Sequence, residues 1–322
     1  MPVQFQGKSM SRPLQVAFFG ECMLELQGAP FGDMHQTMGG DTWNSAIYLR
    51  RCTPRPAVSV HYASALGDDP LSQQMLARWA SAGLELGLVQ RIPGRLPGLY
   101  LIELAPNGER AFHFWRGQSA ARAYFDAAVT PLEAGEAEID LLYLSGISLA
   151  ILDGAARERL FALMGRLRAR GAQVVFDNNY RPRLWPSRAE ACAVFDRAFS
   201  LASTALITLD DHQLLYGHAS LAEAQAAAQA LSAPEIVIKR GAEPTLVRGA
   251  GEAWVEVTTE RVERVVDTTA AGDSFGAGYL SRRLCGASSA EAAAFGNRLA
   301  ARVIQHPGAV IPLEAMQDLM EA

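Results

Sequence analysis

Near its C-terminus the chain reads Asp267-Thr268-Thr269-Ala270-Ala271-Gly272-Asp273-Ser274-Phe275-Gly276-Ala277-Gly278. The stretch follows a valine-rich run at 262–266 that predicts a strand, and it continues into an apolar segment with helical spacing. Because a helix N-terminus carries unpaired N–H groups and the positive end of the helix dipole, this turn can hold an anion. A carboxylate at Asp273 is placed to take a proton from a hydroxyl near that anion, which is the minimum equipment for phosphoryl transfer to an alcohol. A plain capped turn between a strand and a helix fits the local pattern equally well.

Length and composition are typical of one large globular domain. The chain has 322 residues, of which 49% are hydrophobic and 20% charged, so it can bury a sizeable core. We expect a loose tail at 1–13 and a single domain at 14–322. A formal net charge of −5 argues against nucleic acid as a partner, and no apolar run is long enough to span a membrane. The four cysteines lie far apart, which argues against structural zinc and indicates reduced thiols in the cytoplasm.

Short apolar segments alternate with helical ones over most of the chain. Strands are predicted at 16–20, 58–65, 141–145, 173–176, 205–208 and 235–239, and helices at 41–51, 70–83, 154–170, 188–200 and 221–231. Asp41 or Thr42 is the predicted cap of the first helix, after a tight turn at Gly39 and Gly40. The alternation predicts an α/β fold with a parallel sheet covered on both faces. Ligands bind beyond the carboxyl ends of such strands, where the polar segments 177–181, 209–211, 239–241 and 267–273 collect.

One section breaks this alternation. The segments 99–104 and 111–116 flank Pro106-Asn107-Gly108, which predicts a β-hairpin with its turn at Asn-Gly. Aromatic and polar residues alternate along the hairpin, so one face can pack while the other is presented. We expect this hairpin to be an insertion that stands off the main sheet.

Several motifs resemble those of the ribokinase-like (PfkB) sugar kinases. Gly39-Gly40-Asp41-Thr42-Trp43-Asn44 resembles the N-terminal signature of that family, and Asp267–Gly278 resembles the C-terminal one. Four segments resemble the branch that acts on 2-keto-3-deoxygluconate, namely Gly20-Glu21-Cys22-Met23, Arg95-Leu96-Pro97-Gly98-Leu99-Tyr100, 144–152 and 176–185. The order and spacing of the motifs match from about residue 16 to residue 312. The resemblance implies a Rossmann-like, mostly parallel sheet with helices on both faces, plus a small β lid from about 22–38 and 96–117.

The resemblance also implies an activity, which is ATP-dependent phosphorylation of the acidic sugar 2-dehydro-3-deoxy-D-gluconate at its 6-hydroxyl. Asp273 is the implied base, and the backbone N–H groups of Ala271, Gly272 and Asp273 are implied to bind the charge that develops on the phosphate. The implied sugar-binding residues are Gly39, Gly40, Asp41, Asn44, Tyr100, Phe114, Arg116, Arg181 and Asp273. The implied nucleotide-binding residues are Asn179, Arg181, Lys239, Gly241, Ala270, Gly272 and Asn297. A guanidinium suits a carboxylate or a phosphate, so the partner of each arginine stays open.

The chain departs from the pattern of the family at the expected metal site. Many relatives carry N-x-x-E after the strand that ends here near Thr208, an element thought to organise Mg²⁺ and phosphate, whereas this chain continues Leu209-Asp210-Asp211-His212. The protein ligands of Mg²⁺ are therefore undetermined, with Asp211 as a candidate acting through water. The resemblance further implies a possible monovalent cation near Asp267 and a homo-oligomer formed through the lid.

The motifs that define other classes of nucleotide-binding enzyme are absent from this chain. A Rossmann dehydrogenase needs G-x-G-x-x-G after the first strand, where Gly20-Glu21-Cys22 stands, and the G-x-x-x-x-G-K-[ST] of a P-loop kinase is absent. A non-catalytic sugar-binding protein of the same fold would be expected to lose Asp273 or the anion-binding turn. A related kinase that acts on fructose, ribose or 2-dehydro-3-deoxygalactonate is the alternative.

Overall fold

The computed structural model describes residues 12–29, 31–54, 56–104 and 110–320. Its main sheet has nine strands in the order β13-β12-β11-β10-β9-β8-β1-β4-β5. These strands are β1 (Leu14–Phe19), β4 (Val58–Leu66), β5 (Val89–Arg91), β8 (Leu141–Ser145), β9 (Gln173–Asp177), β10 (Thr204–Thr208), β11 (Glu235–Arg240), β12 (Glu243–Arg248) and β13 (Val255–Val257). The strands from β5 to β11 pair in parallel, and β12 and β13 add an antiparallel edge.

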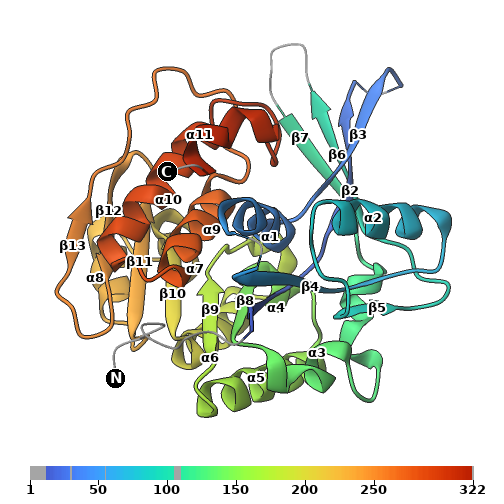
Figure 1. Cartoon of the computed structure of the whole chain (residues 1–322), viewed down its shortest axis with the longest axis horizontal. Helices are drawn as coiled ribbons and strands as arrows, with labels where there is room; N and C mark the ends of the chain where they lie inside the picture. The colour runs from blue at the N-terminus through green and yellow to red at the C-terminus, as the bar shows by residue number, and fades with distance from the viewer. Residues whose placement is uncertain (1–11, 30, 55, 105–109, 321–322) are drawn as a thin grey trace.

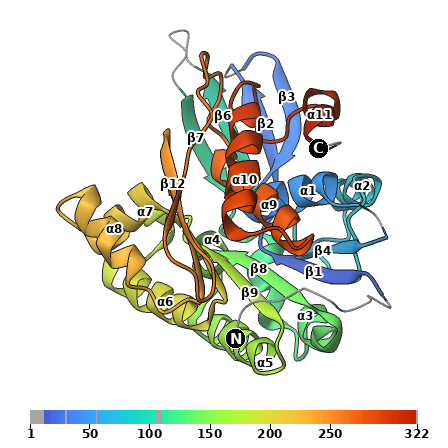
Figure 2. The same ribbon diagram turned by 60° about the vertical axis from the view of Figure 1, so that its left-hand side comes forward.

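Helices cover both faces of this sheet (Figure 2), as the α/β pattern predicted. Val16 and Phe18 of β1 belong to the core on one face, and Ala17 and Phe19 belong to the core on the other. The first core includes residues of α1 (Asp41–Cys52), α2 (Pro70–Ser81), α9 (Ala271–Leu284), α10 (Ser289–Val303) and α11 (Gln317–Met320). The second includes residues of α3 (Pro131–Ala134), α4 (Gly146–Ala150), α5 (Gly154–Ala169), α6 (Arg188–Leu201), α7 (Leu209–Tyr216) and α8 (Leu221–Gln229). Within the described ranges, no helix is long and apolar enough to cross a membrane.

A separate four-stranded sheet, which we call the lid, stands off the main sheet (Figure 1). Its order is β3-β2-β6-β7, with β2 (Met23–Gly28), β3 (Met34–Gly39), β6 (Leu99–Leu104) and β7 (Arg110–Trp115). The two chain segments join where β2 runs parallel to β6, with Leu24 opposite Leu99. The predicted hairpin turn at Pro106-Asn107-Gly108 and most of the predicted tail lie outside the described residues.

Two sequence-based expectations about local structure were wrong, and some elements were not anticipated. The valine-rich run at 262–266 forms no strand, because its backbone bonds to the end of α10, where Val266 N donates to Ile304 O at 2.8 Å, and not to a strand. The first helix is capped by Gly40 without a side-chain cap, since Asp41 is already the first helical residue. Helix α7 and the antiparallel strands β12 and β13 were not anticipated.

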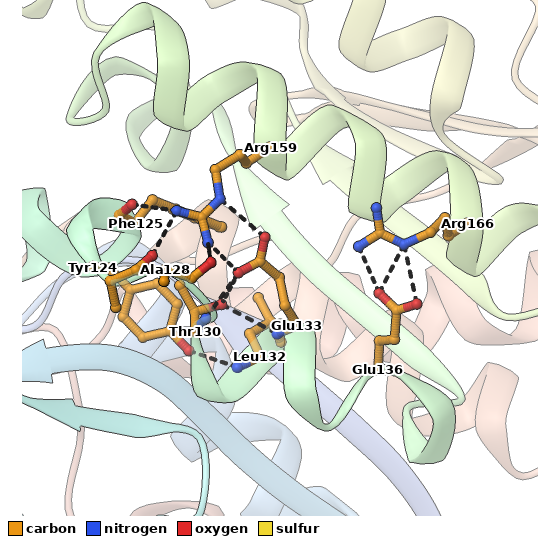
Figure 3. A network of polar contacts seen from close by, with 10 residues as sticks. Tyr124, Phe125, Ala128, Thr130, Leu132, Glu133, Glu136, Arg159 and Arg166 are labelled. Carbon is orange, nitrogen blue, oxygen red and sulfur yellow. Dashed lines mark hydrogen bonds and ion pairs between the residues drawn. The ribbon is translucent and has the colours of Figure 1, made fainter.

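A polar network ties the connection between the lid and β8 to helix α5 (Figure 3). The Arg159 guanidinium donates to both carboxylate oxygens of Glu133 and to the Phe125 carbonyl. Two helical turns further along α5, Arg166 pairs with Glu136 at 2.7 Å. Glu133 also closes a capping box with Thr130 at the start of α3. The arginines of α5 therefore fix a connection that contains only short helices.

Candidate active site

The turn that opens helix α9 leaves two backbone donors free. Ala270, the residue before the helix, has a φ of 61°, and such a conformation costs a non-glycine residue about 1–3 kcal/mol. The Ala271 N–H donates to Thr268 O at 3.2 Å and is used within the turn. The N–H groups of Gly272 and Asp273 donate to no acceptor within the described part of the chain. Of the three backbone donors expected to bind phosphate, these two point out of the helix end unpaired.

Asp273 lies in the first turn of α9, and helix α1 holds its carboxylate in place. Asn44 Nδ2 donates to Asp273 Oδ2 at 2.8 Å, and Ser45 Oγ donates to the Asp273 carbonyl at 3.2 Å. Burial raises the pKa of Asp273 to about 7, and the neighbouring Asp41 carboxylate adds to this rise. A carboxylate with a pKa near neutrality is a competent general base, because a large fraction of it is ionised at pH 7 and it still binds a proton well.

The second carboxylate of the site is Asp41, at the start of α1. Asn179 Nδ2 donates to Asp41 Oδ2 at 2.6 Å, although Asn179 was expected to contact nucleotide. The two glycines before Asp41 are needed for close packing. A Cβ on Gly39 would collide with the Tyr100 hydroxyl of the lid, and a Cβ on Gly40 would collide with the Glu21 carbonyl. Gly39, Gly40 and Asp41 therefore lie where α1 meets the lid.

Lys239 forms a buried ion pair beneath the first turn of α9. Its Nζ donates to Asp177 Oδ2 at 2.8 Å, and Tyr143 OH donates to the same oxygen at 3.2 Å. A Cβ placed on Gly272 would lie 3.4 Å from Lys239 Nζ, so the ammonium is close to the free N–H groups. The ammonium therefore adds positive charge below a turn that already favours anions.

A pocket of about 720 Å³ opens beside Gly272 and Lys239. Its lining contains four of the predicted nucleotide-binding residues, namely Lys239, Gly241, Gly272 and Asn297. Asn179, Arg181 and Ala270 are not part of that lining. The Asn297 side chain braces the wall, since it accepts from Thr245 Oγ1 at 2.8 Å and donates to the Val257 carbonyl at 3.3 Å. A largely apolar pocket with a few polar groups is typical of a site for a small organic ligand.

Two of the predicted sugar-binding residues, Tyr100 and Phe114, are aromatic side chains of the lid strands β6 and β7. Tyr100 is buried and donates its hydroxyl to Glu25, which is buried as well. The Phe114 ring stacks on the Tyr100 ring with centroids 5.7 Å apart, and half of the Phe114 residue is exposed. The two predicted lid contacts are therefore adjacent, with Tyr100 fixed by a carboxylate and Phe114 open to a ligand.

Both predicted anion-binding arginines are ion-paired within the protein. Arg116 pairs with Glu21, and both residues are buried at the base of the lid. Arg116 Nε has no hydrogen-bond partner within the described residues, so this guanidinium keeps a free buried donor. Arg181 pairs with Asp211 at 3.1 Å, and its side chain is about half exposed.

The structure gives little support for a cation site made by protein side chains alone. Within the described residues, no group of three or more His, Cys, Asp or Glu side chains is close enough to hold a metal ion. Asp211, the candidate Mg²⁺ ligand, is ion-paired with Arg181. The Asp267 carboxylate accepts from the backbone N–H groups of Thr269 at 3.0 Å and Gly308 at 2.9 Å, so it shapes the loop before the turn.

The sequence analysis did not predict the acidic residues that pair with the hydrogen-bond donors Arg116, Tyr100 and Lys239. Glu21 pairs with Arg116, Glu25 accepts from Tyr100, and Asp177 pairs with Lys239. The available signal was a carboxylate inside or directly beside an apolar strand, since charged groups are rarely buried unless they are paired. The partner of each of these carboxylates lies far away in the chain, so the sequence could not predict which residues would pair.

Comparison with known proteins gives one consistent result. A model of the pfkB family carbohydrate kinases matches residues 14–316. The 2-dehydro-3-deoxygluconokinase of Dickeya dadantii (strain 3937) is 46% identical, over 94% of this chain and 98% of its own length. The enzyme of the same name from Escherichia coli (strain K12) is 45% identical, over the same shares of both chains.

Solved structures support the ribokinase-like fold that the motifs predicted. A PfkB protein from Polaromonas sp. JS666 has a TM-score of 0.78 at 26% identity, over 94% of this chain and 98% of that one. The fructokinase of Xylella fastidiosa with bound ATP has a TM-score of 0.77 at 24% identity, over 95% and 98%, and at this identity it bears on the fold alone. From the family model, the close relatives and the shared fold together, we conclude that the chain belongs to the PfkB family of carbohydrate kinases.

Proposed function

We propose that this chain transfers the γ-phosphoryl group of ATP to the 6-hydroxyl of 2-dehydro-3-deoxy-D-gluconate. The products are 2-dehydro-3-deoxy-6-phospho-D-gluconate and ADP. The observation that carries the proposal is the turn at Gly272 and Asp273, which combines two unpaired backbone donors with a carboxylate whose pKa is about 7. The relatives at 46% and 45% identity, both named 2-dehydro-3-deoxygluconokinase, support this acceptor over a neutral sugar.

In the proposed reaction Asp273 takes the proton of the acceptor hydroxyl as its oxygen attacks the γ-phosphorus. The bond to the β,γ-bridging oxygen breaks, and ADP leaves with that oxygen. The N–H groups of Gly272 and Asp273 donate to the oxygens of the transferring group, and the Lys239 ammonium adds charge from below. Donors already in place need no reorganisation during the reaction, and each is worth about 3 kcal/mol in comparable sites.

Recognition of the sugar combines the lid with α1 in this proposal. Gly39, Gly40, Asp41 and Asn44 hold its hydroxyls from below, and Tyr100 and Phe114 cover it from the lid. Arg116 is suited to the carboxylate because its buried guanidinium keeps a free Nε donor beside the Glu21 pair. Arg181 lies nearer the phosphates in this scheme, because its half-exposed side chain pairs with Asp211, beside the Lys239 ion pair.

ATP is the proposed phosphoryl donor, with its base in the pocket of about 720 Å³ and its phosphates at Gly272. A Mg²⁺ ion would neutralise charge on those phosphates during transfer. Because no group of three or more metal-binding side chains gathers in the described ranges, the nucleotide phosphates and water would supply most of its ligands. A monovalent cation near Asp267 stays a prediction.

We also propose that two copies of the chain associate through the lid. Trp115 at the end of β7 is 60% exposed, and Leu96 nearby is 59% exposed. Both line a groove of about 1010 Å³ that also includes Leu71 of α2. An exposed apolar surface of this kind marks a site of association, because single chains rarely leave one uncovered. The cytoplasmic location expected from the cysteines stays a prediction.

An acceptor panel tests the proposed activity. The purified protein, ATP and Mg²⁺ are combined with 2-dehydro-3-deoxy-D-gluconate, 2-dehydro-3-deoxy-D-galactonate, fructose or ribose, and ADP release is coupled to NADH oxidation. We expect kcat/KM to be highest for the gluconate-derived acid, at least about 100-fold above fructose and ribose, because a neutral sugar would leave the buried Nε donor of Arg116 without a carboxylate acceptor. A neutral sugar with the highest kcat/KM would overturn the proposal.

A further inference from the structure

A buried ion pair lies where the lid joins the body of the protein. Glu21 stands between β1 and β2, and Arg116 directly follows β7, the last strand of the lid. The two residues pair with each other, although the side chain of Glu21 is only 1% exposed and that of Arg116 only 9%. Charges taken out of water are tolerated when each compensates the other, so each residue of this pair constrains its partner.

The four connections between the lid and the body meet at one edge of the lid. The strand register places the start of β2 beside the end of β3 and beside the start of β6, and it places the start of β6 beside the end of β7. Glu21 and Arg116 both lie at this edge, since one precedes β2 and the other follows β7. Their ion pair therefore links two of the places where the chain crosses between lid and body.

Two glycines leave room for Glu21 at this edge. A Cβ on Gly98, which precedes β6, would lie 2.6 Å from Glu21 Oε1. A Cβ on Gly40, which follows β3, would collide with the Glu21 carbonyl. Gly40 is followed by Asp41 at the start of α1, so the ion pair lies beside the turn that is proposed to hold the acceptor hydroxyls.

The Arg116 guanidinium can serve a second carboxylate while it keeps the first. Within the described ranges Glu21 is its one ionic partner, and its buried Nε has no hydrogen-bond partner. A guanidinium carries five N–H donors, so one carboxylate does not exhaust it. Neither carboxylate oxygen of Glu21 has a hydrogen-bond partner beyond this pair in the same ranges. If Arg116 turned away, Glu21 would be left buried and uncompensated, so the pair should persist when an acid binds.

We propose that Glu21 is a positioning residue that determines the preference for an acidic acceptor: its carboxylate holds the Arg116 guanidinium at the base of the lid, with the unpaired Nε left for the carboxylate of the acceptor. The inference rests on the proposed function, in which Arg116 binds that carboxylate. A long side chain that is already fixed loses less conformational freedom when the ligand arrives. Gly98 contributes by leaving space for the Glu21 carboxylate, so the motifs at 20–23 and 95–100 share one task.

Two variants disturb Glu21 in different ways. Glu21→Gln keeps the size of the side chain and removes its charge, whereas Gly98→Ala keeps the charge and displaces the carboxylate. With ATP as donor, kcat/KM is measured for 2-dehydro-3-deoxy-D-gluconate and for fructose, and calorimetry gives the Kd for ADP. We expect each variant to lower the ratio of the two kcat/KM values, acid over fructose, about tenfold or more, with the ADP Kd within about twofold of wild type. A purely structural role would lower both kcat/KM values together and leave their ratio unchanged.

Gly117→Ala is the matched control. It makes the same substitution as Gly98→Ala directly after Arg116, at a position where an added Cβ meets no atom within 4 Å. This variant should keep the wild-type ratio. Arg116→Met tests whether Glu21 acts through the guanidinium, because in that background Glu21→Gln should leave the ratio unchanged.

The results distinguish this inference from the proposed function. A high wild-type ratio that stays unchanged or rises in Glu21→Gln or in Gly98→Ala would overturn the inference alone. A further fall of the ratio when Glu21→Gln is added to Arg116→Met would also overturn it, because Glu21 would then act without the guanidinium. A wild-type kcat/KM that is higher for fructose than for the acid would overturn the proposed function, and the inference with it.

Discussion

The sugar side and the nucleotide side of Gly272 are built in different ways. On the sugar side, side chains hold one another, with Asn44 bonded to Asp273 at 2.8 Å and Asn179 bonded to Asp41 at 2.6 Å. On the nucleotide side, an open pocket of about 720 Å³ is lined mostly by alanine, threonine, glycine and valine, with the charged residues Lys239, Arg240, Glu260 and Arg261 among them. Chemistry on a hydroxyl needs an oriented base, whereas a nucleotide can be held by shape and backbone donors. The difference teaches that hydrogen bonds from amide side chains to carboxylates order the acceptor end before any ligand arrives.

On the sugar side, the substitution Asp273→Asn is expected to have the largest effect on catalysis. The amide can still accept a hydrogen bond from Asn44, so the fold and the sugar affinity should persist. We expect kcat to fall by about 10³-fold or more, because the hydroxyl proton loses its acceptor. Steady-state kinetics gives kcat, and calorimetry with the sugar gives Kd, which should stay within about threefold of wild type. A variant with near-normal kcat would remove Asp273 from the mechanism.

The pH dependence of kcat/KM, measured for the wild-type protein and for Asp273→Asn, tests whether the Asp273 carboxylate is the base. Burial and Asp41 raise the pKa of Asp273 to about 7, so the base takes up a proton as the pH falls below 7. Wild-type kcat/KM should therefore fall about tenfold per pH unit below that value and level off above it. The residual activity of Asp273→Asn should lack this limb. A wild-type profile that is flat down to pH 5 would contradict a base with this pKa.

Lys239 lies between the two sides, and its replacement by Met is expected to have the next largest effect. Removal of the ammonium takes positive charge from beneath the free N–H groups, and we expect kcat to fall about 100-fold. It also leaves Asp177 buried with only the Tyr143 hydroxyl, which costs about 3–5 kcal/mol of stability. Thermal unfolding together with steady-state kinetics measures both effects.

The double variant Lys239→Met with Asp177→Asn separates these two effects. It removes both charges of the buried pair, so the free energy of unfolding should return toward the wild-type value. The loss of kcat should remain, since the positive charge near the transferring phosphate is still absent. Recovery of kcat in the double variant would show that Lys239 serves only to neutralise Asp177.

The fold could be predicted from the sequence wherever the buried residues give a strand or a helix a recognisable pattern of apolar positions. The parallel strands and their covering helices were predicted because strands buried on both faces of a sheet appear as continuous apolar segments between helical ones. The run at 262–266 misled this approach, since Val265 and Val266 are exposed beside the nucleotide pocket and not paired in a sheet. A β-branched residue in an extended loop has the same local pattern as one in a strand, so only tertiary pairing separates them.

The sequence identified which positions form the candidate site, but it did not show which residues contact one another. The motifs identified the turn at Gly272, the base Asp273 and the glycines before Asp41. They did not reveal that Asn179 reaches Asp41 across 138 positions of the chain. Contacts between strand ends and helix starts depend on how the sheet is ordered, and local sequence does not encode that order.

The smallest expected effect belongs to the nucleotide side and tests whether the two sides are independent. Asn297→Ala removes the bond from Thr245 at 2.8 Å and frees the loop held at the Val257 and Thr258 carbonyls. Stability should fall by about 1–3 kcal/mol, because buried polar groups lose partners. We expect the ATP KM to rise about threefold to tenfold as the pocket wall loosens, with an unchanged sugar KM, because the hydrogen bonds that hold Asp273 and Asp41 do not involve Asn297. Urea titration and both KM values measure this, with Thr245→Val as the matched control that deletes one bond. A sugar KM that rises in parallel with the ATP KM would mean that the ordered acceptor end depends on the nucleotide wall.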